Sequence, residues 1–478
     1  MTIEQDIKQE IVSIQLDNES TIPLYVQLYR HIKQMIEQGK LSTNFKMPPI
    51  RWMAEKLQIN PGTVVRAYKE LEKNGFLISK WGSGSFVAEV PLYESEESDE
   101  QTAFAYQNTA FSEGMIDMSS VALDPDRFSS ESFKRAVNRV LDASGGRAFT
   151  VEDDLGCYSL RESLALELSK RKIMTSPQNV QVISGAQQGI DICARAMIEP
   201  GDCVFAEDPT YPGALESLRA SGAKIIGIPI DENGLRVDEF ERKLEVFRPK
   251  LVYLMPIVQN PTGLSMSQKT KRKILGLAHF YDFYVIEDDY CSGILYDEVE
   301  SAPLKAYDRD DRVIYIRSLS HMFVSGMRLG YLITPSKLAD SLKSVKRMTD
   351  IQTSGLIQRI FDYYLRSNLW NEHKTKLQDS YQHQFAAACR ILDEKFRASF
   401  DWCLPSGGFC FWIRLKNGLS AKKVVEESRK RGLIISNGDA YYVYSKPDDH
   451  LRISIAQVSE EKMVEGFERL AEAIAEIS

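Results

Sequence analysis

A short, very acidic stretch divides this chain of 478 residues into two parts of unequal length. Between Glu94 and Glu100, five of the seven residues are acidic and none is apolar. Such a segment has too little apolar surface to offset the conformational entropy that folding removes. We therefore expect residues 91–113 to be a solvated linker between a head at residues 20–90 and a body at residues 114–478. The pattern fits equally a linker that limits the reach of the head and an inert spacer.

The head and the rest of the chain differ in charge. Residues 20–90 hold seven Lys and three Arg against five Glu, a net charge of +5, so the remainder of this −8 chain carries −13. A basic head on an acidic body favours nucleic-acid binding by the head. A window this short can also be basic by chance, so the local pattern has to decide.

Composition excludes several other classes of protein. The chain is 43% hydrophobic and 26% charged, which is typical of soluble globular proteins, and no apolar run reaches membrane-spanning length. Charged residues in the first turn give no sign of a signal peptide. The seven cysteines are odd in number without a Cys-x-x-Cys pair, and the six histidines are scattered. We expect free thiols in the cytoplasm, no membrane partner and no metal site.

The head contains the pattern of three helices and a hairpin. Apolar residues recur at helical spacing over residues 28–36, 50–57 and 64–71, and Asn60 stands where it can cap the third helix. Two short apolar runs then flank a glycine turn at residues 82–84. This order is typical of a winged helix-turn-helix domain.

Three strings of the head, at residues 47–54, 62–75 and 82–87, resemble those of the gntR family of bacterial regulators in order and spacing. The resemblance implies that the head binds double-stranded DNA. It implies the following DNA-facing residues: Arg51, Thr63, Arg66, Gly82 and Gly84.

Two of these positions leave alternatives open. Thr63 can equally be a helix-start residue without contact to DNA. Gly62 stands where the family commonly has Arg or Lys, which removes one potential contact to a base or phosphate.

The body alternates strand and helix patterns over a length that favours an α/β domain with a mainly parallel sheet, followed by a smaller α+β domain. Residues 181–184 form a strand pattern that ends in a small-residue turn before a helix, where free N–H groups can bind a phosphate. Another apolar strand ends at Asp288 and Asp289, at the strand end where ligands bind in such sheets. Neighbours in a strand point to opposite faces, so only one of the two carboxylates can face a given ligand.

Several separated motifs of the body, in the right order, resemble those of fold-type I aminotransferases, most specifically Asn260-Pro-Thr-Gly263. The resemblance implies a site for pyridoxal 5'-phosphate or pyridoxamine phosphate made by Gly185, Ala186, Gln187, Tyr211, Asn260, Asp288, Tyr290, Ser318, Ser320 and Arg328.

Individual roles within that site follow from the same resemblance. Asp288 faces the pyridine nitrogen, with Asp289 as the alternative, while Asn260 and Tyr290 approach the phenolic oxygen. Arg452 holds a substrate or effector carboxylate, or is instead a strand-edge arginine in a salt bridge. Tyr211 stacks on the pyridine ring or is a buried loop aromatic.

The loop Ser318-Leu-Ser-His321 resembles the cofactor-lysine loop of those enzymes, with His321 where the lysine is expected. A lysine amine condenses with an aldehyde to give an imine, whereas the ring nitrogens of histidine cannot. We therefore expect no catalytic residue here, and a cofactor that is non-covalent if bound. The segment 256–259 has also lost the histidine that usually precedes Gln-Asn-Pro.

A gntR-type head joined to an aminotransferase-like body resembles the MocR/GabR regulators. The resemblance implies a homodimeric transcription regulator whose body senses a small-molecule effector, related to vitamin B6 or an amino acid, without a covalent link to the cofactor. Two alternatives remain. One is an active aminotransferase with an accessory DNA-binding domain, and the other is a regulator whose vestigial pocket serves only dimerisation.

Overall fold

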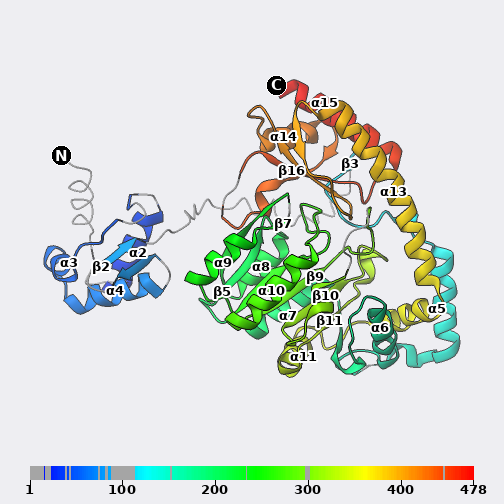
Figure 1. Cartoon of the computed structure of the whole chain (residues 1–478), viewed down its shortest axis with the longest axis horizontal. Helices are drawn as coiled ribbons and strands as arrows, with labels where there is room; N and C mark the ends of the chain where they lie inside the picture. The colour runs from blue at the N-terminus through cyan, green and yellow to red at the C-terminus, as the bar shows by residue number, and fades with distance from the viewer. Residues whose placement is uncertain are drawn as a thin grey trace. The chain divides into compact units, whose positions relative to one another are not determined.

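The computed structural model describes residues 16, 23–37, 40–41, 45–73, 76–80, 84–87, 114–150, 153–232, 234–296, 302–444 and 447–477. The chain divides into two compact units, residues 1–105 and residues 106–478 (Figure 1). The acidic linker expected at residues 91–113 lies outside the described residues.

The first unit contains the three helices and the hairpin that its sequence predicts. The helices are α2 (Leu24–Glu37), α3 (Ile50–Lys56) and α4 (Pro61–Lys73). Strands β1 (Leu77–Lys80) and β2 (Gly84–Val87) pair antiparallel. The winged helix-turn-helix expectation is therefore confirmed at the level of the fold.

The core of the first unit explains why these helices form here. Leu28 and Ile32 from α2, Met53 from α3, and Val64 and Leu71 from α4 are fully buried together. Each lies on the apolar stripe of an amphipathic helix, so helix formation and core formation require the same sequence pattern.

The wing of the first unit has an extra pairing beyond the predicted hairpin. Lys46 forms an antiparallel bridge with Phe86, and the backbone N–H of Met47 donates to the carbonyl of Ser85 at 2.9 Å. The segment before α3 thus lies along β2 and protects the outer edge of the hairpin.

The larger layer of the second unit is an eight-stranded sheet in the order β4-β11-β10-β9-β8-β5-β6-β7. Its strands are β4 (Val180–Ile183), β5 (Cys203–Asp208), β6 (Lys224–Asp231), β7 (Gly234–Leu235), β8 (Leu251–Leu254), β9 (Tyr284–Asp289), β10 (Val313–Ser318) and β11 (Gly330–Ile333). Neighbours from β10 through β6 pair parallel, whereas β11 is antiparallel to both of its partners and β7 is antiparallel to β6. The mainly parallel sheet is as expected.

Figure 1 shows the helices that surround this sheet. They are α5 (Ser130–Ser144), α6 (Tyr158–Lys170), α7 (Ala186–Met197), α8 (Pro212–Ala220), α9 (Val237–Val246), α10 (Gln268–Tyr281), α11 (Ala339–Asp350) and α12 (Gly355–Arg366). Val204 and Ala206 of β5 pack in the core that contains α7 and α8, whereas Phe205 between them packs with α9 and α10. Burial on both faces explains why the strands are apolar along most of their length.

The smaller layer is a four-stranded antiparallel sheet in the order β12-β13-β16-β15. It comprises β12 (Phe400–Trp402), β13 (Cys410–Leu415), β15 (Ser436–Asn437) and β16 (His450–Ser454), with α13 (Leu369–Phe396), α14 (Ala421–Lys430) and α15 (Glu460–Ile477). The long helix α13 packs on α15 of the smaller layer and on α12 of the larger layer (Figure 1). It therefore ties the two layers together.

A short segment at the start of the second unit also joins the smaller layer. Strand β3 (Ile116–Asp117) pairs parallel with β14 (Leu433–Ile434). Beyond it, the N–H of Ser454 donates to the carbonyl of Met118 at 2.7 Å. This pairing fixes the loop at residues 118–121, which reaches the site described below.

Three further observations concern membrane-spanning helices, metal ligands and cysteines. Within the part of the chain that the structure describes, no helix has both the length and the apolar character needed to cross a membrane. Over the same residues, no group of three or more His, Cys, Asp or Glu side chains is placed to hold a metal ion. All seven cysteines are free thiols.

Candidate functional site

The carboxyl end of β9 places two neighbouring carboxylates on opposite sides of the sheet. Asp288 and Asp289 are 2% and 1% exposed, so both are withdrawn from water. A buried carboxylate costs several kcal/mol unless hydrogen bonds or opposite charges satisfy it. The partners of each one therefore show what it does.

Asp289 belongs to a group that we call the ion cluster: Arg171, Asp289, Ser292, Tyr315 and Arg317. Its Oδ2 accepts from Arg171 at 2.7 Å, from the Tyr315 hydroxyl at 2.6 Å and from the Ser292 hydroxyl at 2.8 Å. Its Oδ1 accepts from Arg317 and from the Ser292 N–H. Against the effect of burial, the two guanidinium groups hold the pKa of Asp289 well below its usual range. Both carboxylate oxygens of Asp289 therefore have their hydrogen-bond partners within this cluster.

Only one of the two carboxylate oxygens of Asp288 accepts a hydrogen bond among the described residues. Its Oδ2 accepts from the Tyr253 hydroxyl at 2.7 Å, but its buried Oδ1 has no hydrogen-bond partner among the described residues. Burial raises the pKa of Asp288 to about 7, although the Tyr253 hydrogen bond acts in the opposite direction. An unsatisfied buried oxygen of this kind is typical of a group that awaits a ligand.

The turn from β4 to α7 forms a cradle for an anion. Gly185 precedes the helix with φ of +106°, and a Cβ atom there would lie 2.8 Å from an Nη atom of Arg328. The Arg328 guanidinium therefore lies directly against the glycine, beside the free N–H groups of the first turn at Ala186 and Gln187. Helix N–H groups and an adjacent guanidinium are a combination suited to phosphate.

The Gln187 side chain does not take part in this cradle as a free donor. Its Nε2 donates to the Gly213 carbonyl and to the Ser217 hydroxyl, both at 2.9 Å, which ties α7 to α8. Only the backbone of Gln187 is available to an anion. Tyr211, at the start of α8, is half-buried, and its ring would lie 2.8 Å from a Cβ atom at Gly213.

The loop after β10 contributes two buried serines. The Ser318 hydroxyl accepts from the N–H of Ser320 at 3.2 Å. The Ser320 hydroxyl is buried and has no partner within the described part of the chain. Arg328, at the end of this loop, is exposed.

His321, which stands at the lysine position of the motif, is held in one orientation. Its Nδ1 lies 2.8 Å from the carbonyl oxygen of Val121, and because a carbonyl only accepts, Nδ1 carries the hydrogen. The Tyr290 ring meets the imidazole edge-on at 5.6 Å between centroids. Burial lowers the pKa of His321 to about 4, and the positive charge of Arg328 and Arg452 acts in the same direction. The imidazole is therefore neutral at physiological pH.

Arg452 and Asn260 lie together at the other end of the site. Arg452 Nη1 donates to Asn260 Oδ1 at 3.2 Å, and Nη2 donates to the Ser119 carbonyl and the Ser436 hydroxyl. Its buried Nε has no partner among the residues described. Since β16 lies between β13 and β15, the alternative of a strand-edge arginine is wrong: Arg452 sits inside the sheet.

The candidate DNA-facing residues lie on the surface of the first unit. Arg51 of α3 and Arg66 of α4 are exposed, and the Arg66 guanidinium stacks over the Tyr25 ring at 4.0 Å. Gly84 opens β2 with φ of +105°. Gly82 lies outside the described residues.

Thr63 is a half-buried residue in the first turn of α4. Its N–H donates to the Asn60 carbonyl at 2.9 Å, while the Asn60 side chain accepts from the Gly62 N–H at 2.7 Å. Asn60 thus caps the helix, as expected, and the Thr63 side chain is not required for that task.

Several residues of the site did not emerge from the sequence. Tyr253 lies on β8 beside β9 and Glu207 on β5, the next strand of the sheet, both near Asp288. Ser119 and Val121 accept hydrogen bonds from Arg452 and His321. The polar residues inside the apolar strands β5 and β8 were a detectable signal, because parallel neighbours end at the same edge of a sheet. The two carbonyls of residues 119 and 121 have no sequence signature.

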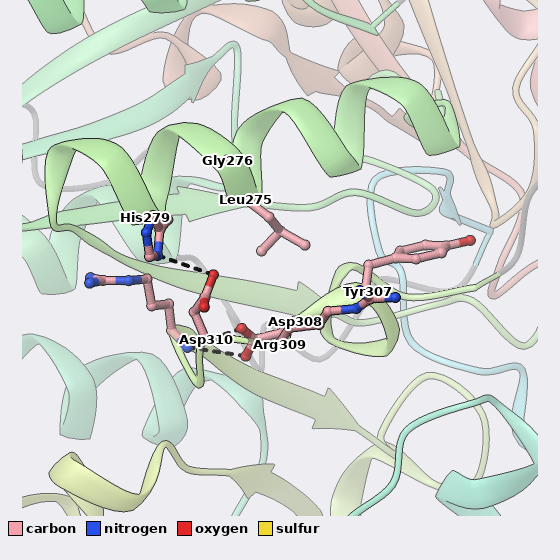
Figure 2. A pocket seen from close by; sticks show the side chains of 8 residues that line it. Leu275, Gly276, His279, Tyr307, Asp308, Arg309 and Asp310 are labelled. Carbon is pink, nitrogen blue, oxygen red and sulfur yellow. Dashed lines mark hydrogen bonds and ion pairs between the residues drawn. The ribbon is translucent and has the colours of Figure 1, made fainter.

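A separate hollow of about 380 Å³ lies between α10 and the loop before β10 (Figure 2). It is lined by side chains that include His279, Tyr307, Arg309 and Arg312, and His279 pairs with Asp310 at 3.3 Å. It contains none of the residues predicted for the cofactor.

Comparison with known families matches both parts of the chain. Residues 113–470 match the family of class I and II aminotransferases, and residues 24–87 match the gntR family of bacterial regulatory proteins. The chain is similar to the uncharacterised HTH-type transcriptional regulator YcxD of Bacillus subtilis, with 28% identity over 93% of this chain and 98% of that protein. It is 26% identical to the probable rhizopine catabolism regulatory protein MocR of Rhizobium meliloti, over 96% of this chain and 95% of that one.

Among solved structures, the kynurenine aminotransferase of Pyrococcus horikoshii superposes with a TM-score of 0.73 at 29% identity. That match covers 76% of this chain and 91% of the other. The likeness to MocR runs almost from end to end, whereas the likeness to the enzyme leaves out about a quarter of this chain. This chain therefore belongs to the class I and II aminotransferase family, joined, as in MocR-type regulators, to an N-terminal domain of the gntR family of bacterial regulatory proteins.

Proposed function

We propose that this chain is a DNA-binding transcription regulator whose aminotransferase-like unit is a ligand sensor without enzymatic activity. In this proposal the unit binds pyridoxal 5'-phosphate or pyridoxamine phosphate, or a related amino-acid derivative, without a covalent link to the protein. The observation that carries it is His321, a neutral imidazole fixed on Val121 where the family motif has a lysine.

The residues present fit a vitamin B6 phosphate. Gly185, the N–H groups of Ala186 and Gln187, and Arg328 form a cradle suited to its phosphate, with Ser318 and Ser320 beside it in the lysine-type loop. The unsatisfied Oδ1 of Asp288 suits a pyridinium N–H.

The remaining roles follow the family motif. Asn260 and Tyr290 would hold the phenolic oxygen, Tyr211 would pack on the ring, and Arg452 would bind an effector carboxylate. When bound, the cofactor supplies a reactive aldehyde or amine. Without a lysine, this chain provides neither covalent attachment nor the usual proton carrier.

DNA binding falls to the first unit. Residues 20–90 carry a net charge of +5, and this charge together with the exposed cations Arg51 and Arg66 suits a phosphate backbone, with Thr63, Gly82 and Gly84 as further contacts. We propose that the protein acts in the cytoplasm as a homodimer that binds two half-sites.

Native mass spectrometry of the full-length protein with each B6 phosphate tests the sensor proposal. We expect a non-covalent adduct that is lost on denaturation, no product after borohydride treatment, and no transamination. A borohydride-stable adduct on a lysine together with turnover would establish the accessory-domain enzyme instead. Failure of both phosphates to bind would leave a vestigial pocket.

His321→Lys sharpens this test. If the rest of the pocket is competent, the variant acquires a covalently attached, coloured cofactor, with at most slow turnover because segment 256–259 differs from the enzyme motif. A folded variant that stays colourless in excess pyridoxal phosphate would refute the cofactor site. His383→Lys, at an exposed position of α13, is the matched control.

A further inference from the structure

We propose that His321 makes this site selective for the amine form of vitamin B6 phosphate over the aldehyde form. The inference rests on the proposed function and specifies its ligand: pyridoxamine phosphate, or another phosphate ligand with a hydrogen-bond donor at the same carbon. The inference follows from which nitrogen of the His321 imidazole donates a hydrogen bond and which one accepts.

The first step is the tautomer of His321. Because Nδ1 donates to the Val121 carbonyl at 2.8 Å, the hydrogen of the neutral ring resides there, and Nε2 presents a lone pair. The hydrogen bond that one ring nitrogen of a histidine makes to a fixed group commonly determines which of the two nitrogens is protonated.

The second step is that the acceptor of this bond is itself held in place. The Asp117 carboxylate accepts from the N–H of Ser119 at 2.8 Å and from its hydroxyl at 2.6 Å. The N–H of Ser454 on β16 donates to the Met118 carbonyl at 2.7 Å. The loop that carries Val121 is therefore fastened to the smaller sheet, so the tautomer of His321 is set by tertiary structure.

The third step excludes the other protonation states. The opposite tautomer would turn a lone pair of Nδ1 toward the part-buried Val121 carbonyl and remove the hydrogen bond between them. The doubly protonated ring is opposed by burial and by the guanidinium groups of Arg328, Arg452 and Arg317. Tyr290, the aromatic neighbour of the ring, supplies no negative charge because burial raises the pKa of its phenol.

The consequence for a ligand is a requirement for a donor. An amine donates a hydrogen bond to Nε2, whereas an aldehyde oxygen is only an acceptor and faces the lone pair. In the enzymes that this chain resembles, the lysine at this position joins the aldehyde. The histidine here thus does more than remove an attachment point, because it reverses which form of the cofactor the position favours.

The test uses the full-length protein and three phosphates: pyridoxamine phosphate, pyridoxal phosphate, and 4'-deoxypyridoxine phosphate, whose methyl group neither donates nor accepts. In calorimetric titrations we expect pyridoxamine phosphate to bind about tenfold or more tighter than either of the others, the scale expected when a buried polar group gains or loses its partner. His321→Ala should reduce this preference to about twofold or less, while His383→Ala should retain it.

A spectroscopic readout checks the cause without any ligand. Nitrogen-15 NMR of the histidine side chains, with His321 assigned from the missing signals of His321→Ala, should show hydrogen on Nδ1 and none on Nε2. The opposite tautomer, or equal affinities for the three phosphates, would overturn the inference while leaving a non-covalent sensor in place. Absence of binding by all three would instead overturn the proposed function.

Discussion

At the carboxyl end of β9, two neighbouring aspartates have opposite surroundings. On one side of the sheet, Asp289 is surrounded by two guanidinium groups and two hydroxyls that satisfy both of its oxygens. On the other side, Asp288 has one tyrosine and an unsatisfied oxygen. The same strand thus supplies one carboxylate to the structure and one to the site.

The difference shows how a buried charge can be assigned a role. Fully satisfied groups stabilise the fold and are costly to break, whereas partly satisfied groups cost stability and are retained where a ligand completes them. The unsatisfied Ser320 hydroxyl and Arg452 Nε lie among the residues proposed for the ligand, and not in the ion cluster.

The largest effect is expected from breaking the ion cluster. Asp289→Ala removes the counter-charge of the buried Arg317 and of the half-buried Arg171, so it should destabilise the second unit by about 3–5 kcal/mol. Urea denaturation followed by circular dichroism measures this loss. Asp288→Ala is the matched control on the same strand and should cost far less. Equal losses would contradict the division of roles.

For ligand binding we expect the opposite order, with Asp288 more important than Asp289. Asp288→Asn keeps the size of the side chain but removes the charge available to a pyridinium. It should weaken binding of pyridoxamine phosphate by about 2–3 kcal/mol, as expected for a charged hydrogen bond. Calorimetric titration of the full chain provides the measurement. Unchanged affinity in a variant of native stability would remove Asp288 from the site.

The exposed cations of the first unit provide a third case, because their removal should weaken DNA binding without destabilising the fold. Arg51→Ala should weaken binding to a cognate promoter by about 1–3 kcal/mol at fixed salt, without lowering the unfolding temperature. Fluorescence anisotropy with a labelled duplex measures this change. The exposed Arg242→Ala of the second unit serves as control, and an equal effect from it would indicate non-specific charge attraction.

The smallest effect concerns Glu207, the second buried carboxyl near Asp288. Burial raises its pKa to about 8, against hydrogen bonds from Met255 and Gln259. The folded state therefore binds this proton more tightly than the unfolded state, and the stabilisation, complete at acid pH, is lost as the pH rises through about 8.

Between pH 7 and pH 9 we expect the ligand-free protein to lose about 1 kcal/mol through this group, and Glu207→Gln to abolish that loss. Denaturation at the two pH values measures it, with the exposed Glu245→Gln as control. An unchanged pH dependence in Glu207→Gln would assign the loss to another group.

Much of the architecture could be predicted because it depends on local patterns. Helical spacing and the Asn60 cap define α4, and an apolar strand that ends in acids defines β9. The alternation of side chains along β9 also showed that only one of the two aspartates could face a given ligand. Alternation alone did not choose between them, and Asp288 was favoured only by the family resemblance; that Asp289 is occupied depends on Arg171 and Arg317, which reach it from elsewhere in the fold.

The sequence by itself determined that a basic DNA-binding type of head precedes an aminotransferase-like body, and that residue 321 cannot attach an aldehyde. Only the tertiary structure decided that Asp289 is occupied, that Arg452 lies inside a sheet and that His321 carries its hydrogen on Nδ1. The reason is that composition and periodicity are properties of neighbouring residues, whereas the satisfaction of a buried polar atom depends on partners distant in the chain. Val121 lies 200 residues from His321, and no pattern along the chain joins them.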